Sequence, residues 1–428
     1  MKKKFSCFIL ALTLILFLFA GCNRSSQSAA SDGQVTLTLW SIWSSDSESN
    51  KAPFLKTLEE FRAAYPNIRV ELDMNEAEAF RAKMRTAIAA DEAPDVFYYN
   101  AGGLLKAFVD AGKVLPLDDY LSKDVWDRLI DGTLANMTFD GKVYGLPYTL
   151  ACSVMFCNKE LFDRYNVKIP ETWDELLTAI RTFRSAGITP MTTGGRDRWP
   201  TSMYADLLML RAAGYQACYD AFNKNSNGTF LGSGMRLAAE KFAELLAVGA
   251  FPPGVVALTR DESEVPFLAG EVAMYVNGNW TAANCQADSS AVKGKIIAAP
   301  FPVIPGGAGG INDFMGGAAE QFSVSMNTKH REEAVLLCQF IAENHSKNAY
   351  LAGAGMPTWK ANVDASMIDP LIASIVALTN NASSFLLWGN TILEGEDSEY
   401  LMDVTQEMLM GALTPDQFLQ RLQTGIYK

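Results

Sequence analysis

The sequence predicts an α/β fold, built mainly on a parallel sheet, because strand-like and helix-like segments alternate after residue 34. The alternation occupies the first part of the chain and begins again near residue 144. A chain of 428 residues of which 49% are hydrophobic is long enough for two or three domains with a large core.

The first group of elements lies between residues 35 and 117. Strands are recognised by alternating apolar residues, and helices by apolar residues three or four positions apart. The predicted elements, in order, are a strand at 35–39, a helix carrying Phe54, Leu58, Phe61 and Tyr65 that stops at Pro66, a strand at 68–74, a helix carrying Phe80, Met84 and Ile88, a strand at 95–100 and a helix within 104–117.

The second group begins with a long strand at 144–158 and a helix within 171–187. Thr172 and Glu175 form the pattern of a capping box, and Gly187 suits the end of that helix. Further predicted elements are helices at 202–213 and 235–248, strands at 271–278, 293–307 and 322–327, a helix at 331–344 and a helical region after 357.

The N-terminus predicts export. Three lysines precede a run of apolar residues, and Ala20 and Gly21 stand before Cys22, which is the layout of a signal sequence. The segment resembles a bacterial lipoprotein signal, with residues 1–21 removed, Cys22 lipidated and residues 22–34 forming a flexible linker, although Phe19 stands where Leu is usual. An uncleaved anchor and an ordinary secretory signal are the alternatives.

The net charge and the cysteines argue against some classes of function. The net charge is −12, and removal of the three lysines of the signal would leave about −15, which disfavours nucleic acid as a partner. The five remaining cysteines include no CxxC pair, and Cys152 and Cys157 face opposite sides of a strand. We therefore interpret Cys152, Cys157, Cys218, Cys285 and Cys338 as small buried residues, and we predict no metal and no cofactor.

Motifs for catalysis are scarce. The only histidines, His330 and His345, are predicted to be solvated at the ends of a surface helix. The sequence has no HExxH, no GxSxG elbow and no P-loop, so we predict that the protein is not an enzyme. A glycoside hydrolase needs only two carboxylates and stays open as an alternative.

The tryptophans are more informative. Several lie where strands or helices end beside Asn, Asp, Gly or Ser, as in SIWSSD, GRDRWPTS, NGNWTAAN and LLWGN. An indole stacks on the apolar face of a sugar ring while polar neighbours bind its hydroxyls, so these positions indicate a carbohydrate cleft.

Several long segments resemble family 1 extracellular solute-binding proteins, which capture carbohydrate for ABC importers and include relatives of maltose-binding protein. The segments are VTLTLWSIWSSDSE, the stretch from APDVFYYN to DDYL, the stretch from GKVYGLPYTL to DELL, FLAGEVAMYVNGNW, and the stretch from AEQFSVSMN to FIAE. GITPMTTGGRDRWPTSMYADLLMLRAAG is similar to the branch that binds oligosaccharides.

This resemblance implies a two-lobed fold of the periplasmic-binding-protein type, with ligand held between the lobes. One lobe would comprise residues 35–148 plus 300–350, and the other residues 149–299 plus 351–428. YGLPYTL and IAAPFPV would be the hinge crossings.

The resemblance also assigns ligand-binding roles. Trp280 would stack on a sugar ring with Asn279 beside it, and the other predicted contacts are Trp43, Ser44, Asp46, Asn100, Tyr148, Trp199, Gly317, Glu320 and Trp388. From residue type alone, each of these positions also fits packing, capping or a turn.

We therefore predict an exported, lipid-anchored monomer that captures a mono- or oligosaccharide between its lobes and delivers it to an ABC permease, facing the periplasm or the cell exterior. The same fold binding a polyol or glycerol phosphate is the second reading, because Arg196 and Arg198 lie beside Trp199.

Overall fold

A computed structural model describes residues 34–428, of which Val35–Lys428 form one compact unit. The predicted signal segment, Cys22 and nearly all of the linker lie outside the described residues. Within the described part of the chain, no helix has the length and apolar character needed to cross a bilayer.

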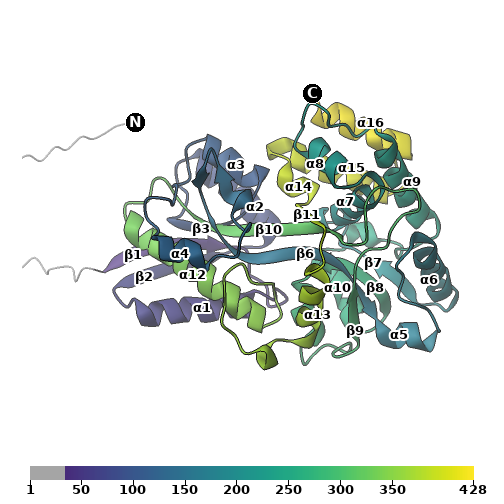
Figure 1. Cartoon of the computed structure of the whole chain (residues 1–428), viewed down its shortest axis with the longest axis horizontal. Helices are drawn as coiled ribbons and strands as arrows, with labels where there is room; N and C mark the ends of the chain where they lie inside the picture. The colour runs from purple at the N-terminus through teal and green to yellow at the C-terminus, as the bar shows by residue number, and fades with distance from the viewer. Residues whose placement is uncertain (1–33) are drawn as a thin grey trace, which may run out of the picture. The chain divides into compact units, whose positions relative to one another are not determined.

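Nine strands form one sheet, in which the order along the main path is β2-β1-β3-β10-β6-β8-β7, with β11 beside β10 and β9 beside β6 (Figure 1). Their bounds are β1 Val35–Ser41, β2 Ile68–Met74, β3 Val96–Asn100, β6 Leu146–Asn158, β7 Thr189–Thr192, β8 Val272–Gly278, β9 Ile296–Ala299, β10 Asp313–Val324 and β11 Ser384–Leu386. A separate hairpin pairs β4 (Thr138–Phe139) with β5 (Lys142–Val143).

The sheet is mixed, whereas the sequence pattern predicted a mainly parallel one. β1 pairs in parallel with β2 and β3, and β7 pairs in parallel with β8. The long strands β6 and β10 pair antiparallel with each other, β10 with β3 and β6 with β8. Strand direction depends on where a segment returns to the sheet, which local alternation does not encode.

The N-lobe is defined here by one hydrophobic cluster that joins β1–β3 to the helices around them, with Phe54, Phe97 and Phe322 at its centre. Its helices are α1 Lys51–Ala64, α2 Ala77–Ala89, α3 Gly103–Asp110, α4 Lys123–Arg128 and α12 Arg331–Leu351, with a 3-10 turn at Ala135–Met137. Trp359 also packs in this cluster, although the sequence assigned residues after 350 to the other lobe.

The C-lobe is defined by two further clusters, one on each side of β6 and β8. Its helices are α5 Lys159–Arg164, α6 Trp173–Ser185, α7 Trp199–Ala213, α8 Tyr215–Phe222, α9 Ser233–Ala247, α10 Arg260–Leu268, α11 Thr281–Gln286, α13 Pro370–Thr379, α14 Gly389–Ile392, α15 Gly395–Leu409 and α16 Pro415–Ile426, with 3-10 turns at Val255–Ala257 and Ala365–Met367.

Two long strands, β6 and β10, pass from one lobe to the other. Leu146 and Phe322 pack in the N-lobe cluster, while Met155 and Met315 pack in the C-lobe. The segment IAAPFPV, predicted to be the second crossing, instead stays in the C-lobe, where β9 pairs with β6 and Arg211 donates from Nε to the Phe301 carbonyl at 2.9 Å. IAAPFPV and the segment of β10 are both strand-like in sequence, so only their pairing partners show which of them crosses between the lobes.

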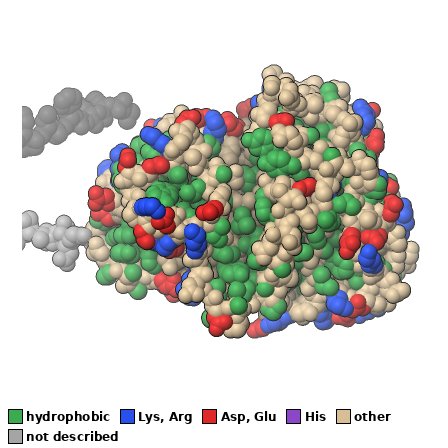
Figure 2. All heavy atoms as spheres, in the orientation of Figure 1, with side chains coloured by type: hydrophobic (Ala, Val, Ile, Leu, Met, Phe, Trp, Pro, Cys, Tyr) green, Lys and Arg blue, Asp and Glu red, His purple; other side chains and the backbone are tan. Residues whose placement is uncertain are grey.

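Local signals in the sequence were reliable. Thr172 and Glu175 form the predicted capping box, and Gly187 ends α6 with a φ of +75°, a conformation that suits glycine. The five cysteines of the described region are buried and free, as predicted. On the face shown in Figure 2, acidic and basic side chains are interspersed.

His345 contradicts its predicted solvated position. It is fully buried in α12, where its ring stacks on Tyr148 with centroids 4.7 Å apart and lies 4.9 Å from the ring of Trp43. Neither ring nitrogen has a hydrogen-bond partner among the described residues, and burial lowers the pKa of His345 to about 3. The helix is seven residues longer than predicted and packs on α1 and β6, so its middle is interior.

Candidate functional site

A cavity of about 110 Å³ lies where residues of both lobes meet the strands β6 and β10. The N-lobe contributes residues from the loop after β1, from α2 and from β3, and the C-lobe contributes residues from α7, α10 and the turns after β8 and β11. The lining residues are Ile42, Trp43, Glu48, Ser49, Asn50, Ala77, Arg81, Tyr98, Asn100, Tyr148, Trp199, Met203, Arg260, Trp280, Glu320, Trp388, Asn390 and Thr391. We call this cavity the front pocket.

Three tryptophans form the C-lobe wall of the front pocket. The ring of Trp280 lies edge-on to Trp199 and to Trp388, with centroids 6.1 Å apart in both pairs. Trp388 is fixed by a hydrogen bond from its Nε1 to Ser153 Oγ at 2.8 Å. A β-carbon on Gly278 would lie 2.1 Å from the Trp280 ring, so the glycine makes room for the indole.

Glu320 lies opposite, on the crossing strand β10. Tyr98 Oη donates to its Oε1 at 2.7 Å, and Tyr148 Oη donates to its Oε2. Burial raises the pKa of Glu320 above its ordinary value, although the two hydroxyl groups partly oppose this effect. Burial also raises the pKa of both tyrosines, so their hydroxyl groups stay protonated donors.

Both cations of the pocket are matched by carboxylates. Arg81 Nη1 lies 2.6 Å from Glu78 Oε1. Arg260 lies 3.0 Å from Glu48, 2.9 Å from Asp261 and 2.6 Å from Glu264. The pocket therefore offers hydrogen-bonding groups beside aromatic rings with little net positive charge, which suits a neutral, hydroxyl-rich ligand better than an anion.

Seven of the predicted ligand-binding residues line the front pocket: Trp43, Asn100, Tyr148, Trp199, Trp280, Glu320 and Trp388. Trp43 is 2% exposed and also belongs to the N-lobe aromatic cluster. The structure thus brings together residues from positions 43 to 388 of the chain.

The other four predicted residues lie elsewhere. The Asp46 side chain is 98% exposed and pairs with Lys51 at 2.6 Å, while the Ser44 carbonyl accepts from Lys51 Nζ at 2.8 Å. Asn279 is turned into the protein, where it bonds the backbone of Leu150 and Cys152 at 3.1 Å. Gly317 lines a second cavity, described below. The Asp46 and Asn279 side chains bond partners outside the front pocket, and none of the four residues lines it.

The prediction missed several lining residues, among them Glu48, Arg81, Tyr98, Arg260, Asn390 and Thr391. Because strand side chains alternate, Tyr98 and Asn100 lie on the same face of β3. Tyr98 could therefore have been predicted from Asn100. Arg81 and Arg260 lie on helices whose placement over the pocket no local pattern indicates.

Together, the two-lobed α/β fold and the aromatic pocket between its lobes define a ligand-binding protein of the periplasmic-binding type. Residues 44–347 match the family model of the bacterial extracellular solute-binding proteins, and the chain belongs to this family.

Known proteins extend this similarity over most of the chain. A solved structure from work on xylan utilization by the thermophilic bacterium Caldanaerobius polysaccharolyticus is 38% identical, covers 92% of this chain and 100% of its own, and superimposes with a TM-score of 0.89. A chitin oligosaccharide binding protein is 26% identical over 92% of this chain and 98% of its own, with a TM-score of 0.83. The melibiose/raffinose/stachyose-binding protein of Bacillus subtilis is 25% identical over 84% of this chain and 82% of its own length.

Proposed function

We propose that this protein captures a neutral sugar in the front pocket and delivers it to an ABC permease, without chemical change to the sugar. The observation that carries the proposal is the wall formed by Trp199, Trp280 and Trp388 opposite the Glu320 carboxylate in a cavity between two lobes. An indole covers the apolar face of a pyranose, and a carboxylate with amide neighbours accepts from its hydroxyls.

The charges of the pocket favour a neutral sugar over glycerol phosphate. Arg198 is already bound to Glu399 at 2.8 Å and to Asp403 at 2.6 Å, and Arg196 lies 3.4 Å from Glu262. A phosphate would have to displace these carboxylates, and Arg81 and Arg260 are paired in the same way.

We propose a short saccharide built from xylose as the ligand to test first. The protein from work on xylan utilization is more similar to this chain than the chitin oligosaccharide binding protein. The front pocket, at about 110 Å³, is smaller than most sites for organic ligands, so its size favours a short ligand over a long chain.

Capture would proceed by closure of the lobes about β6 and β10. A ligand that contacts the tryptophans of the C-lobe and the carboxylate side of the N-lobe at once binds the closed state more tightly, so it shifts the population toward closure. Ligand binding would then be reported to the permease as a change in lobe arrangement.

Trp280→Ala tests the stacking role directly. We expect wild-type protein to bind xylose, xylobiose or xylotriose, and we expect Trp280→Ala to weaken that binding at least tenfold, about 1.4 kcal/mol, in isothermal titration calorimetry. The control is Trp126→Ala, because Trp126 lies on α4 outside the pocket and its Nε1 donates to the Leu121 carbonyl.

The same panel should include chito-oligosaccharides, raffinose, maltose, glycerol and glycerol 3-phosphate. Tightest binding of glycerol 3-phosphate would contradict the neutral-sugar proposal. Chromatography of the sugar after long incubation should recover it unchanged, and a hydrolysis product would instead establish a glycosidase.

A further inference from the structure

The turn α14 lies directly on two adjacent glycines at the start of α3. A β-carbon on Gly103 would lie 2.0 Å from the Ile392 carbonyl oxygen, and one on Gly102 would lie 2.9 Å from the Thr391 carbonyl oxygen. Both obstacles are backbone atoms, which cannot rotate away. The contact therefore requires that positions 102 and 103 lack side chains.

The two sides of this contact belong to different lobes. α3 is fixed in the N-lobe cluster through Leu105 and Phe108. α14 is fixed in the C-lobe, where Trp388 and Leu393 pack in the large cluster and the Gly389 N–H donates to the buried Asp206 carboxylate at 2.9 Å. Hinge motion about β6 and β10 would separate α3 from α14.

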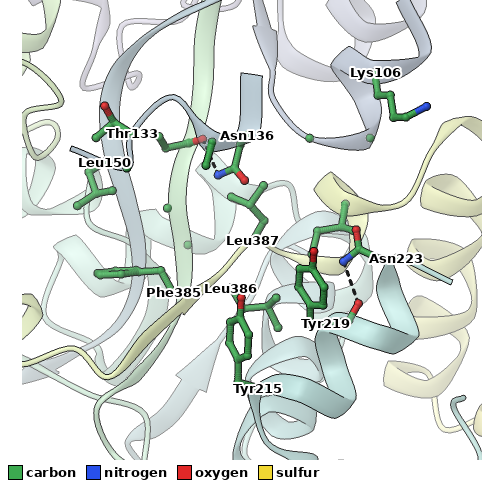
Figure 3. Close-up of a pocket in the computed structure, with 18 of the residues that line it drawn as sticks. Lys106, Thr133, Asn136, Leu150, Tyr215, Tyr219, Asn223, Phe385, Leu386 and Leu387 are labelled. Carbon is green, nitrogen blue, oxygen red and sulfur yellow. Dashed lines mark hydrogen bonds between the residues drawn. The ribbon is translucent and has the colours of Figure 1, made fainter. Parts of the chain in front are cut away.

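The contact also lies between two cavities. Asn390 and Thr391 of α14 line the front pocket, whereas Ile392 and Leu387 line a second cavity of about 710 Å³ on the other side. Figure 3 shows this second cavity, with Leu387 near its centre between Asn136 and Tyr219. The backbone contact at Gly102–Gly103 is thus part of the boundary that separates the two spaces.

We propose that Gly102 and Gly103 form a side-chain-free seat that receives α14 when the lobes close and so positions Trp388, Asn390 and Thr391 around the ligand. The part of this inference that concerns the ligand rests on the proposed function. The contact between α3 and α14 on closure does not depend on it. Gly103 is a positioning residue, since its effect on the ligand passes through α14.

Replacement of Gly103 by alanine offers a test, because its expected effects on stability and on ligand binding differ in sign. It is the first residue of α3, and its φ is not in the left-handed region that makes substitution of Gly102 strained. Alanine favours a helix over glycine, so Gly103→Ala should leave the protein at least as stable as wild type while the lobes are apart. The β-carbon added by Gly103→Ala would block closure of the lobes. The proposal therefore predicts weaker ligand binding without a loss of stability.

A disulfide trap measures closure without any ligand. Ser47 in the N-lobe loop after β1 donates to Asp261 of α10 in the C-lobe at 2.5 Å, so cysteines placed at both positions should cross-link faster when the lobes are closed. The native cysteines of the described region are buried, which limits competing reactions. In this background, Gly103→Ala should slow cross-linking by oxidised glutathione at least fivefold.

Gly232→Ala is the matched control, because Gly232 directly precedes α9 and a β-carbon there would meet only Thr229, at 4.0 Å. It should cross-link at the wild-type rate. Equal rates in Gly103→Ala and Gly232→Ala would overturn the seat, as would a lowered melting temperature of ligand-free Gly103→Ala, which would show a role in folding alone.

Titration with xylobiose completes the test. Gly103→Ala should weaken xylobiose binding at least tenfold, and unchanged affinity would overturn the inference while the proposed function stands. If wild-type protein binds none of the sugars, the proposed function fails, and the cross-linking rates still decide whether the seat exists.

Discussion

At the scale of single residues, Asp206 is an unusual buried acid. It is fully buried in α7, where one carboxylate oxygen accepts from the Gly389 N–H and the other has no partner among the described residues. Burial raises the pKa of Asp206 to about 7, and the Gly389 hydrogen bond only partly opposes this effect. Asp206 therefore holds the turn that carries Asn390 and Thr391. Its ionisation in this buried position lowers the stability of the folded protein.

Asp206→Asn should remove that cost. Because the pKa in the folded state is above the unfolded value of about 4, the contribution of Asp206 to stability is fully present below pH 4 and is lost as the pH rises through 7. At pH 8 the loss amounts to at most about 4 kcal/mol, since one pKa unit corresponds to about 1.4 kcal/mol.

Melting curves of wild type and Asp206→Asn at pH 5 and pH 8 check this prediction. We expect the variant to gain in melting temperature relative to wild type, and to gain clearly more at pH 8 than at pH 5. The same difference at both pH values would show that Asp206 does not titrate between them.

At the scale of elements, two sets of contacts join the lobes on either side of the front pocket. On one side, Arg198 at the start of α7 lies 3.7 Å from Glu78 of α2, and Arg85 of α2 lies 3.2 Å from Glu399 of α15. On the other side, Glu48 pairs with Arg260, and Asn284 of α11 donates to the Ser47 carbonyl at 3.0 Å. The two lobes are therefore in contact on both sides of the front pocket.

Arg85→Gln should weaken ligand binding by up to about fivefold, because an ion pair as exposed as this one contributes roughly 0.2–1 kcal/mol. We expect calorimetry at 0.05 and 0.5 M NaCl to show that salt lowers the affinity of wild-type protein for xylobiose. Salt should lower the affinity of the variant less. Arg421→Gln is the control, since Arg421 pairs with Glu407 inside the C-lobe. An equal salt dependence in all three proteins would exclude a role for the Arg85–Glu399 pair in closure.

At the scale of the whole molecule, a protein that delivers a ligand to a permease gains from attachment to the same membrane, because a tether raises its effective concentration there. The mature chain would begin at Cys22 and reach the folded unit through residues 22–34. Two or more acyl chains on Cys22 would anchor it stably.

Cys22→Ser should release the protein from the membrane. We expect wild-type protein in the membrane fraction of fractionated cells and the variant in the soluble fraction, and metabolic labelling with a fatty acid should mark only the wild type. Membrane association of the serine variant would instead indicate an uncleaved N-terminal anchor.

By itself the sequence determined the local elements, because capping, alternation and helical spacing depend on neighbours in the chain; Thr172, Gly187 and the strand at 271–278 are examples. The family segments further indicated the two lobes and most of the aromatic residues of the pocket.

Only the tertiary structure decided which segments cross between the lobes and which polar side chains face the ligand. Asn279 lies next to Trp280 in the chain, yet it binds the backbone of β6, while Arg81 and Asn390 meet at the pocket from positions 309 residues apart. The physical reason is that side-chain direction and lobe contact depend on pairing across the sheet and on closure, and both join residues far apart in sequence.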